Sequence, residues 1–388
     1  MTRSIIPALF LVLGSACVLA QDARSIHNQA VVVDTHGDIL SDQIGSGIDL
    51  GKRQPGGNFD LIRAREGGLD VQVFSIWCDE RHGFKRAMQE IDSLESLIRR
   101  YPSKIALATN AAELQRVVKS GRLAAMIGVE GGHMIENSLE RLDELAKRGM
   151  IYMTLTWNNS TPWATSAADE SKKTGLQHKG LTEQGKKIVS RLNELGVMVD
   201  LSHVGETTFY DALKVTTKPV IASHSSAYAL NPHSRNLKDA QLKAIARNGG
   251  VVFVNFYSGF LDSTYSNKQA AFLRRHAEEM ERLTREYDSK YKAEAVLSVK
   301  YKDEVEGMRA PLSLLVEHID HMVNVMGEDH VGLGADFDGA ESYPVHLDDV
   351  TGYPAITEAL VKKGYSAKRI EKILGGNFIR VLKANKGK

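Results

Sequence analysis

Eight apolar runs rich in β-branched residues recur along the chain, and segments with helical periodicity separate most of them. The runs are residues 31–39, 70–77, 124–131, 152–157, 197–203, 219–225, 250–257 and 330–337. Because they are continuously apolar rather than alternating, they are typical of strands buried on both faces of a parallel sheet. Eight strand–helix repeats predict an α/β protein with a closed (β/α)8 barrel of the TIM type, about 250 residues plus insertions. A doubly wound open sheet is the alternative fold.

The segments between these runs also indicate how the chain is organised. Helical patterns cover residues 84–100, 138–148, 182–195, 237–248 and 312–326. No Gly/Ser-rich linker interrupts the repeats, so residues 21–388 are predicted to form a single barrel domain. Residues 261–309 are dense in Lys, Arg and Glu, which predicts a solvated helical insertion between the seventh and eighth strands. This insertion starts at the face of the barrel where active sites lie, so a lid or an oligomer contact is its alternative role.

The first twenty residues have the pattern of an export signal. Arg3 provides a positive start, residues 5–20 carry no charge, and Ala20 offers a small residue for cleavage before Gln21. A lipoprotein signal centred on Cys17 is the alternative. The apolar run is short for a membrane anchor. We therefore expect a periplasmic or secreted protein without a transmembrane anchor in its mature form.

The charge balance limits the partners that the chain can have. Removing residues 1–20 takes away Arg3 and leaves 48 basic against 48 acidic residues. A chain with equal numbers of basic and acidic residues lacks the excess of positive charge that is typical of proteins binding nucleic acid or an anionic membrane. Cys78 is the single cysteine after residue 20, so no intrachain disulfide can form in the mature chain.

Polar side chains stand at the ends of five of the eight predicted strands. Residues i and i+2 of a strand project to the same face, so His36 and Asp38 can both point toward the mouth of the barrel. Glu130 follows the third strand and precedes two glycines, and its carboxylate has two oxygens that can bridge two cations. The other members of this set are His203, His224 and Asp336, at the ends of the fifth, sixth and eighth strands.

This set of strand ends predicts a metal site. A single buried histidine is usually a core residue whose hydrogen bonds are satisfied. Ionisable residues at the ends of five strands are not expected from packing alone, because buried charges need partners. A ligand set of His, Asp and Glu without cysteine suits zinc, and manganese or iron are the alternative metals. Glu317, His318 and His321 lie mid-helix and are predicted to be structural or surface residues, and Asp200 is predicted to support a strand end or a ligand. The chain has no His-Glu-x-x-His, phosphate-binding loop or Gly-x-Ser-x-Gly motif.

The same residues resemble the motifs of the membrane dipeptidase (renal dipeptidase) family, peptidase family M19, within the amidohydrolase superfamily. The likeness extends from about residue 31 to residue 383. It rests on these blocks: Asp34-Thr35-His36-Gly37-Asp38, Gly128-Val129-Glu130-Gly131-Gly132-His133, Thr161-Pro162-Trp163-Ala164, Asp200-Leu201-Ser202-His203, Ser223-His224-Ser225-Ser226, Arg235-Asn236, Val254-Asn255-Phe256-Tyr257 and Asp336-Phe337-Asp338-Gly339. The resemblance implies a metallo-dipeptidase that cleaves dipeptides to free amino acids, often with tolerance of a D-residue at the second position.

The resemblance also implies the roles of individual residues. It implies two zinc ions per chain, with His36 and Asp38 on the first, Glu130 bridging both, His203 and His224 on the second, and Asp336 beside the first. Asp336 and Glu130 are the implied catalytic residues, and Asp336 would handle the proton of a bridging hydroxide. Arg235 would bind the α-carboxylate of the substrate, and Tyr257 is counted among the substrate-binding residues.

One position departs from the family pattern. The family usually has a histidine after its Leu-Thr stretch that contacts the substrate carbonyl or the developing oxyanion, whereas here Trp157 follows Thr156. An indole donates one hydrogen bond and carries no charge, so Trp157 cannot replace that histidine. Asn158 or Asn159 could donate instead, with Trp157 shaping the substrate pocket. The simpler reading is a slower enzyme that has lost the histidine.

The sequence therefore predicts zinc-dependent dipeptide hydrolysis by a metal-bridging hydroxide. The alternatives are another amidohydrolase reaction, such as deacylation of an N-acyl amino acid, and a non-catalytic metal- or ligand-binding relative. A homodimer is expected only because symmetric dimers are the commonest assembly of soluble proteins.

Overall fold

The computed structural model describes residues 22–41, 46–79, 83–172 and 176–387. The predicted export signal, including Cys17, lies outside the described residues. Within the described residues, no helix is both long enough and apolar enough to cross a membrane.

A parallel barrel forms the centre of the molecule. Its strands follow the order β1-β2-β4-β5-β6-β7-β8-β9, all neighbours being parallel. A further bridge between Gly37 and Phe337 joins the end of β1 to the segment after β9 and nearly closes the barrel. The strand bounds are β1 Val33–Gly37, β2 Val71–Ile76, β4 Leu123–Val129, β5 Met150–Thr154, β6 Met198–Asp200, β7 Ile221–Ala222, β8 Val251–Val254 and β9 Val331–Leu333.

The barrel confirms the predicted fold class, because each of the eight predicted runs overlaps one barrel strand, with β4 and β5 beginning one and two residues before the predicted runs. All residues of these eight strands are buried, as continuous apolar runs require. One short strand, β3 (Ile105–Leu107), was not predicted. It pairs with the first residues of β4 outside the barrel order, and three residues are too few for a recognisable pattern.

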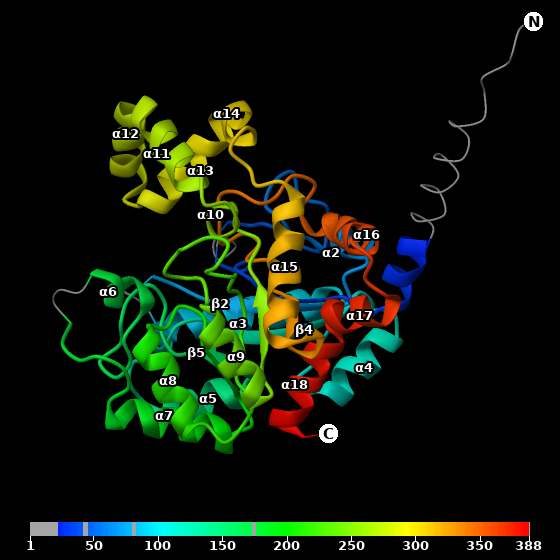
Figure 1. The fold of residues 1–388 in the computed structure, drawn as a ribbon, viewed down its shortest axis with the longest axis vertical. Helices are drawn as coiled ribbons and strands as arrows, with labels where there is room; N and C mark the ends of the chain where they lie inside the picture. Colours follow the sequence, from blue (N-terminus) through cyan, green and yellow to red (C-terminus); the bar gives the residue numbers. More distant parts are fainter. Residues whose placement is uncertain (1–21, 42–45, 80–82, 173–175, 388) are drawn as a thin grey trace, which may run out of the picture.

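Helices cover the outside of the barrel (Figure 1). Their apolar faces explain the packing: in α3 the residues Ala87, Ile91 and Leu94 recur at helical spacing and are buried. The bounds are α2 Leu61–Glu66, α3 Gly83–Arg100, α4 Ala111–Lys119, α5 Leu139–Lys147, α6 Ala167–Lys172, α7 Glu183–Glu194, α8 Glu206–Val215, α9 Asp239–Asn248, α15 Leu312–Met326, α16 Tyr353–Lys362, α17 Ala367–Glu371 and α18 Asn377–Lys386.

The predicted helical insertion stands away from the barrel as a separate lobe between β8 and β9 (Figure 1). After the short helix α10 (Ser258–Leu261) it contains α11 Tyr265–Arg275, α12 Ala277–Tyr287, α13 Lys290–Lys300 and α14 Lys302–Glu306. The sequence predicted a solvated helical insertion. The structure adds that the lobe has a small apolar core of its own, which includes Phe272, Leu283 and Leu297.

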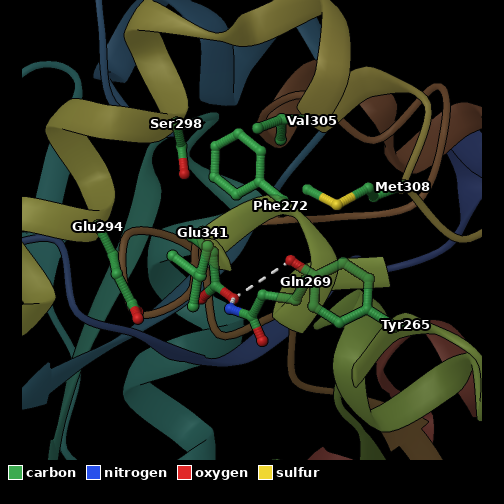
Figure 2. A pocket seen from close by; sticks show the side chains of 9 residues that line it. Tyr265, Gln269, Phe272, Glu294, Ser298, Val305, Met308 and Glu341 are labelled. Carbon is green, nitrogen blue, oxygen red and sulfur yellow. Dashed lines mark hydrogen bonds between the residues drawn. The ribbon is translucent and has the colours of Figure 1, made fainter. Parts of the chain in front are cut away.

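The lobe is tied to the loop that follows β9 through Glu341. One oxygen of this carboxylate accepts hydrogen bonds from the Tyr257 hydroxyl at 2.6 Å, the Gln269 amide at 2.7 Å and the Tyr265 hydroxyl at 3.2 Å. Figure 2 shows Gln269 and Tyr265 directed toward Glu341 at a small pocket that residues of the insertion line together with Glu341. The insertion is therefore anchored next to the loop that carries Asp336.

Candidate metal centre

The polar strand ends predicted from the sequence meet at the carboxyl-terminal mouth of the barrel. Ligand atoms of His36, Glu130 and His224 lie within 4.8 Å of one another, and so do those of His36, Asp38 and Asp336. Parallel strands in a barrel end at the same face, which is why residues so distant in the sequence come together here.

Glu130 lies at the centre of the cluster. Its Oε2 atom is 3.4 Å from His36 Nε2, while its Oε1 atom is 2.8 Å from His203 Nε2 and 3.4 Å from His224 Nε2. One carboxylate thus presents its two oxygens to two separate groups of histidines. This arrangement suits a bridge between two cations.

The other carboxylates lie on the His36 side. His36 Nε2 is 3.7 Å from Asp38 Oδ1 and 3.8 Å from Asp336 Oδ1. Both His36 Nε2 and Asp38 Oδ1 are buried and make no hydrogen bond within the described residues. Buried polar atoms are nearly always satisfied, so these unpartnered atoms fit the ligand set of a metal ion.

The electrostatics of the cluster also favour a cation. Burial lowers the pKa of His36, but the facing carboxylates, Glu130 foremost, outweigh burial and raise it to about 10. Burial lowers the pKa of His203 to about 4 and also lowers that of His224. His203 and His224 therefore stay neutral, the form in which imidazole binds a metal.

The outer nitrogens of these histidines have hydrogen-bond partners, as metal-binding histidines usually do. His36 Nδ1 is 2.8 Å from the Tyr152 hydroxyl, and His203 Nδ1 is 3.1 Å from Asn158 Oδ1. His224 Nδ1 is 2.8 Å from Ser223 Oγ, which donates to Asp200 Oδ2 at 2.6 Å. The sequence did not identify Tyr152 or Ser223 as partners of these histidines. Each lies in or beside a buried strand, where its pattern is that of a core residue.

Asp336 is held by its neighbours beside the cluster. The Asn255 amide donates to Asp336 Oδ2 at 2.9 Å, and the Tyr343 hydroxyl donates to the carbonyl of Asp336 at 2.8 Å. Burial raises the pKa of Asp336 to about 6. Asp336 and His203 have φ angles of 63° and 65°, in the left-handed region that few non-glycine residues adopt.

Arg235 lies buried behind His224. Its Nη2 atom donates to the carbonyl oxygen of His224 at 3.3 Å, its Nε atom is buried without a hydrogen bond, and no described carboxylate forms an ion pair with it. Its guanidinium also stacks 5.4 Å from the centre of the Phe260 ring. Burial lowers the pKa of Arg235 to about 10, so it remains charged near neutral pH.

Of the other predicted substrate-binding residues, Trp157 and Asn158 lie beside His203, whereas Tyr257 faces the insertion. Trp157 is half-buried, with its ring 5.0 Å from that of Trp77 and 6.5 Å from that of His203. The carboxamide oxygen of Asn158 is directed at His203. Tyr257 directs its hydroxyl to Glu341, at the junction of the barrel and the insertion.

The histidine pair in α15 is not part of the cluster. His318 accepts from the Ala227 amide at 3.0 Å and lies 3.1 Å from the carbonyl of Leu261, while His321 pairs with Asp239 at 2.8 Å. These three contacts support packing, as predicted for these positions.

A parallel barrel with buried His, Asp and Glu side chains at the carboxyl ends of its strands is the arrangement of a metal-dependent hydrolase. The chain belongs to the membrane dipeptidase family, peptidase family M19, whose family model matches residues 20–387. It is 32% identical over 385 residues to an uncharacterized dipeptidase of Schizosaccharomyces pombe, covering 94% of this chain and 82% of that protein.

Two solved structures are also similar. Dipeptidase AC, a metallopeptidase of family M19, is 26% identical, with a TM-score of 0.75 and coverage of 93% of this chain and 100% of that chain. A metallopeptidase of Rhodobacter sphaeroides is 25% identical, with a TM-score of 0.73 and coverage of 92% and 99%; it is bound to a phosphinate mimic of the dipeptide L-Ala-D-Ala. Family and site together identify a metallo-dipeptidase, and dipeptide hydrolysis as its metal-dependent reaction.

Proposed function

We propose that this dipeptidase works with two zinc ions, held as the sequence suggested. His36 and Asp38 would hold the first ion, His203 and His224 the second, and Glu130 both. The observation that carries the proposal is the placement of the two Glu130 oxygens, one toward His36 and the other toward His203 and His224. Bound there, two zinc ions would lower the pKa of a water molecule to about 7 and polarise the scissile carbonyl.

In this proposal Asp336 moves the protons of the reaction. Its carboxylate faces the His36 side of the cluster, where it can accept a proton from the attacking water and return it to the leaving amine. The Asn255 amide holds one carboxylate oxygen, which leaves the other directed at the cluster.

The metal count tests the proposal directly. Elemental analysis of the purified protein should find about two zinc ions per chain, and chelation should abolish dipeptide hydrolysis. A single tightly held ion in an active protein would contradict the two-metal centre.

Arg235 is proposed to bind the free α-carboxylate of the dipeptide. A buried guanidinium without an ion pair is costly unless a ligand supplies the partner charge, and its planar fork matches a carboxylate. Its position behind His224 puts it at the edge of the metal cluster.

Arg235→Met should raise KM for dipeptides while the metal content stays at the wild-type value. A charge-assisted hydrogen bond contributes roughly 1.5–3 kcal/mol, or about 10–150-fold in binding. Steady-state kinetics with a dipeptide and its C-terminal amide provide the measurement. Wild-type enzyme should prefer the free acid and the variant should not; equal wild-type cleavage of both substrates would rule out this role.

Trp157 and Trp77 are proposed to form an aromatic wall beside the second metal position. Trp157 and Trp77 follow β5 and β2, which flank β4, and Glu130 follows β4, so the two rings meet close to the bridging carboxylate. The indole N–H of Trp77 is buried without a hydrogen bond within the described residues, which leaves it free to donate to a ligand.

Trp157→Leu should therefore reduce binding of dipeptides with a basic side chain more than that of alanyl dipeptides. A cation over an indole face gains about 0.5–2 kcal/mol, so the selective rise in KM should be about 2–30-fold. The measurement compares Lys-containing with Ala-containing dipeptides. An equal change for both would show that Trp157 packs without contacting the substrate side chain.

We also propose export, because the charged start and the uncharged apolar run up to Ala20 form a cleavable signal. N-terminal sequencing of exported protein should begin near Gln21. A lipidated Cys17 would instead show a lipoprotein.

A further inference from the structure

We propose that Asn158 is a positioning residue of the second metal position and acts through His203. The inference rests on the two-zinc centre proposed above. His203 Nε2 faces Glu130 Oε1 at 2.8 Å and His224 Nε2 at 2.9 Å, so this nitrogen points into the cluster. The other ring nitrogen, Nδ1, lies 3.1 Å from the carboxamide oxygen of Asn158.

The tautomer of His203 explains why an oxygen is needed there. An imidazole that binds a metal through Nε2 carries its hydrogen on Nδ1, and that N–H needs an acceptor. The oxygen of Asn158 accepts, whereas the amide nitrogen would place a donor against a donor. This hydrogen bond fixes both the tautomer and the rotation of the His203 ring.

The loop around Asn158 is itself held against the His203 loop. The Ser166 hydroxyl donates to the carbonyl of Asn158 at 2.8 Å, and Ser166 forms a backbone bridge with Val204. The Ala167 amide donates to the carbonyl of His203 at 2.7 Å. These contacts join the two loops, and they hold the Asn158 oxygen beside a histidine whose backbone is in the left-handed region.

His203 differs in this respect from the other two histidines. The partner of His36 is Tyr152 in β5, and the partner of His224 is Ser223 next to β7, backed by Asp200 in β6. The partner of His203 comes from a loop instead. A substitution of Asn158 therefore removes one hydrogen bond of the metal position without touching the ladder of the barrel.

The first test measures zinc affinity by chelator competition. Loss of the partner of a metal-binding histidine typically costs about 10–100-fold in metal affinity. Asn158→Ala should show this loss for one of the two ions, Asn158→Asp should retain the acceptor and the affinity, and Asn159→Ala is the matched control with unchanged affinity. The kcat of Asn158→Ala should rise from its value at limiting zinc to a higher value at saturating zinc, because the loss lies in metal binding.

A double-mutant cycle shows where the effect acts. In a His36→Asn background, which keeps the second position, Asn158→Ala should weaken the remaining zinc by the same 10–100-fold. In a His203→Asn background the effect should disappear, because the partner of Asn158 is gone.

Three results would overturn the inference: unchanged affinity in the His36→Asn background, an equal loss in the His203→Asn background, or a kcat about 10-fold lower at saturating zinc with unchanged affinity. The last would assign Asn158 to the substrate oxyanion. A wild-type protein that binds only one zinc would instead refute the two-metal centre itself.

Discussion

Asp336→Asn is expected to lower kcat by a factor on the order of 10² or more while both metal ions stay bound. The asparagine has nearly the same shape and can still accept the hydrogen bond that Asn255 donates to position 336. It cannot accept a proton from water near neutral pH. The loss should therefore appear in kcat, because the substitution leaves the proposed carboxylate contact of Arg235 in place.

Asp338→Asn provides a matched control two residues further along the same loop. It also removes one negative charge, and an asparagine oxygen can still accept from the Asn58 backbone amide, which donates to Asp338 at 2.7 Å. Rates of dipeptide hydrolysis should be compared at equal zinc content for both variants. Near wild-type turnover by fully metallated Asp336→Asn would show that another group moves the proton.

The residues of the cluster could be predicted from the sequence because they are ionisable side chains at the ends of long apolar runs. His36, Glu130 and His224 follow long apolar runs, and burial of such groups is costly unless they share a partner. Once the runs are assigned to a parallel barrel, geometry alone brings their ends to one face. The spacing and type of the residues predicted the barrel and the cluster at its strand ends, but they left a doubly wound open sheet as the alternative, which the strand order and the Gly37–Phe337 bridge exclude.

The partners of these ligands were not predictable in the same way. Tyr152 lies within an apolar strand, where a phenol that contacts His36 has the same pattern as a core residue. Asn158 meets His203 across two loops that are 45 positions apart in the sequence, and loop contacts leave no periodic signal. Composition likewise predicted helices in residues 261–309, but not their packing around an apolar core, which depends on tertiary contacts.

Glu130→Gln should weaken both metal positions together. A glutamine keeps one oxygen but replaces the other with an amide nitrogen that cannot serve as a ligand, and it removes the negative charge shared by the two ions. In either orientation of the amide, one metal position loses its ligand oxygen. Both positions lose the attraction of the negative charge. Because loss of a mere hydrogen-bond partner of a ligand costs about 10–100-fold in affinity, loss of the bridge should cost more than about 100-fold.

The measurement is zinc content after dialysis against a graded series of chelator concentrations, with circular dichroism to confirm that the variant is folded. Glu130→Gln should lose both ions over one range of chelator, and dipeptide hydrolysis should be lost with them. His36→Asn and His203→Asn are the comparison variants, because each removes a ligand on one side of Glu130 and should cost mainly one ion. If Glu130→Gln retained one ion at wild-type affinity, Glu130 would belong to a single metal position, and the two histidine groups would not share a bridge.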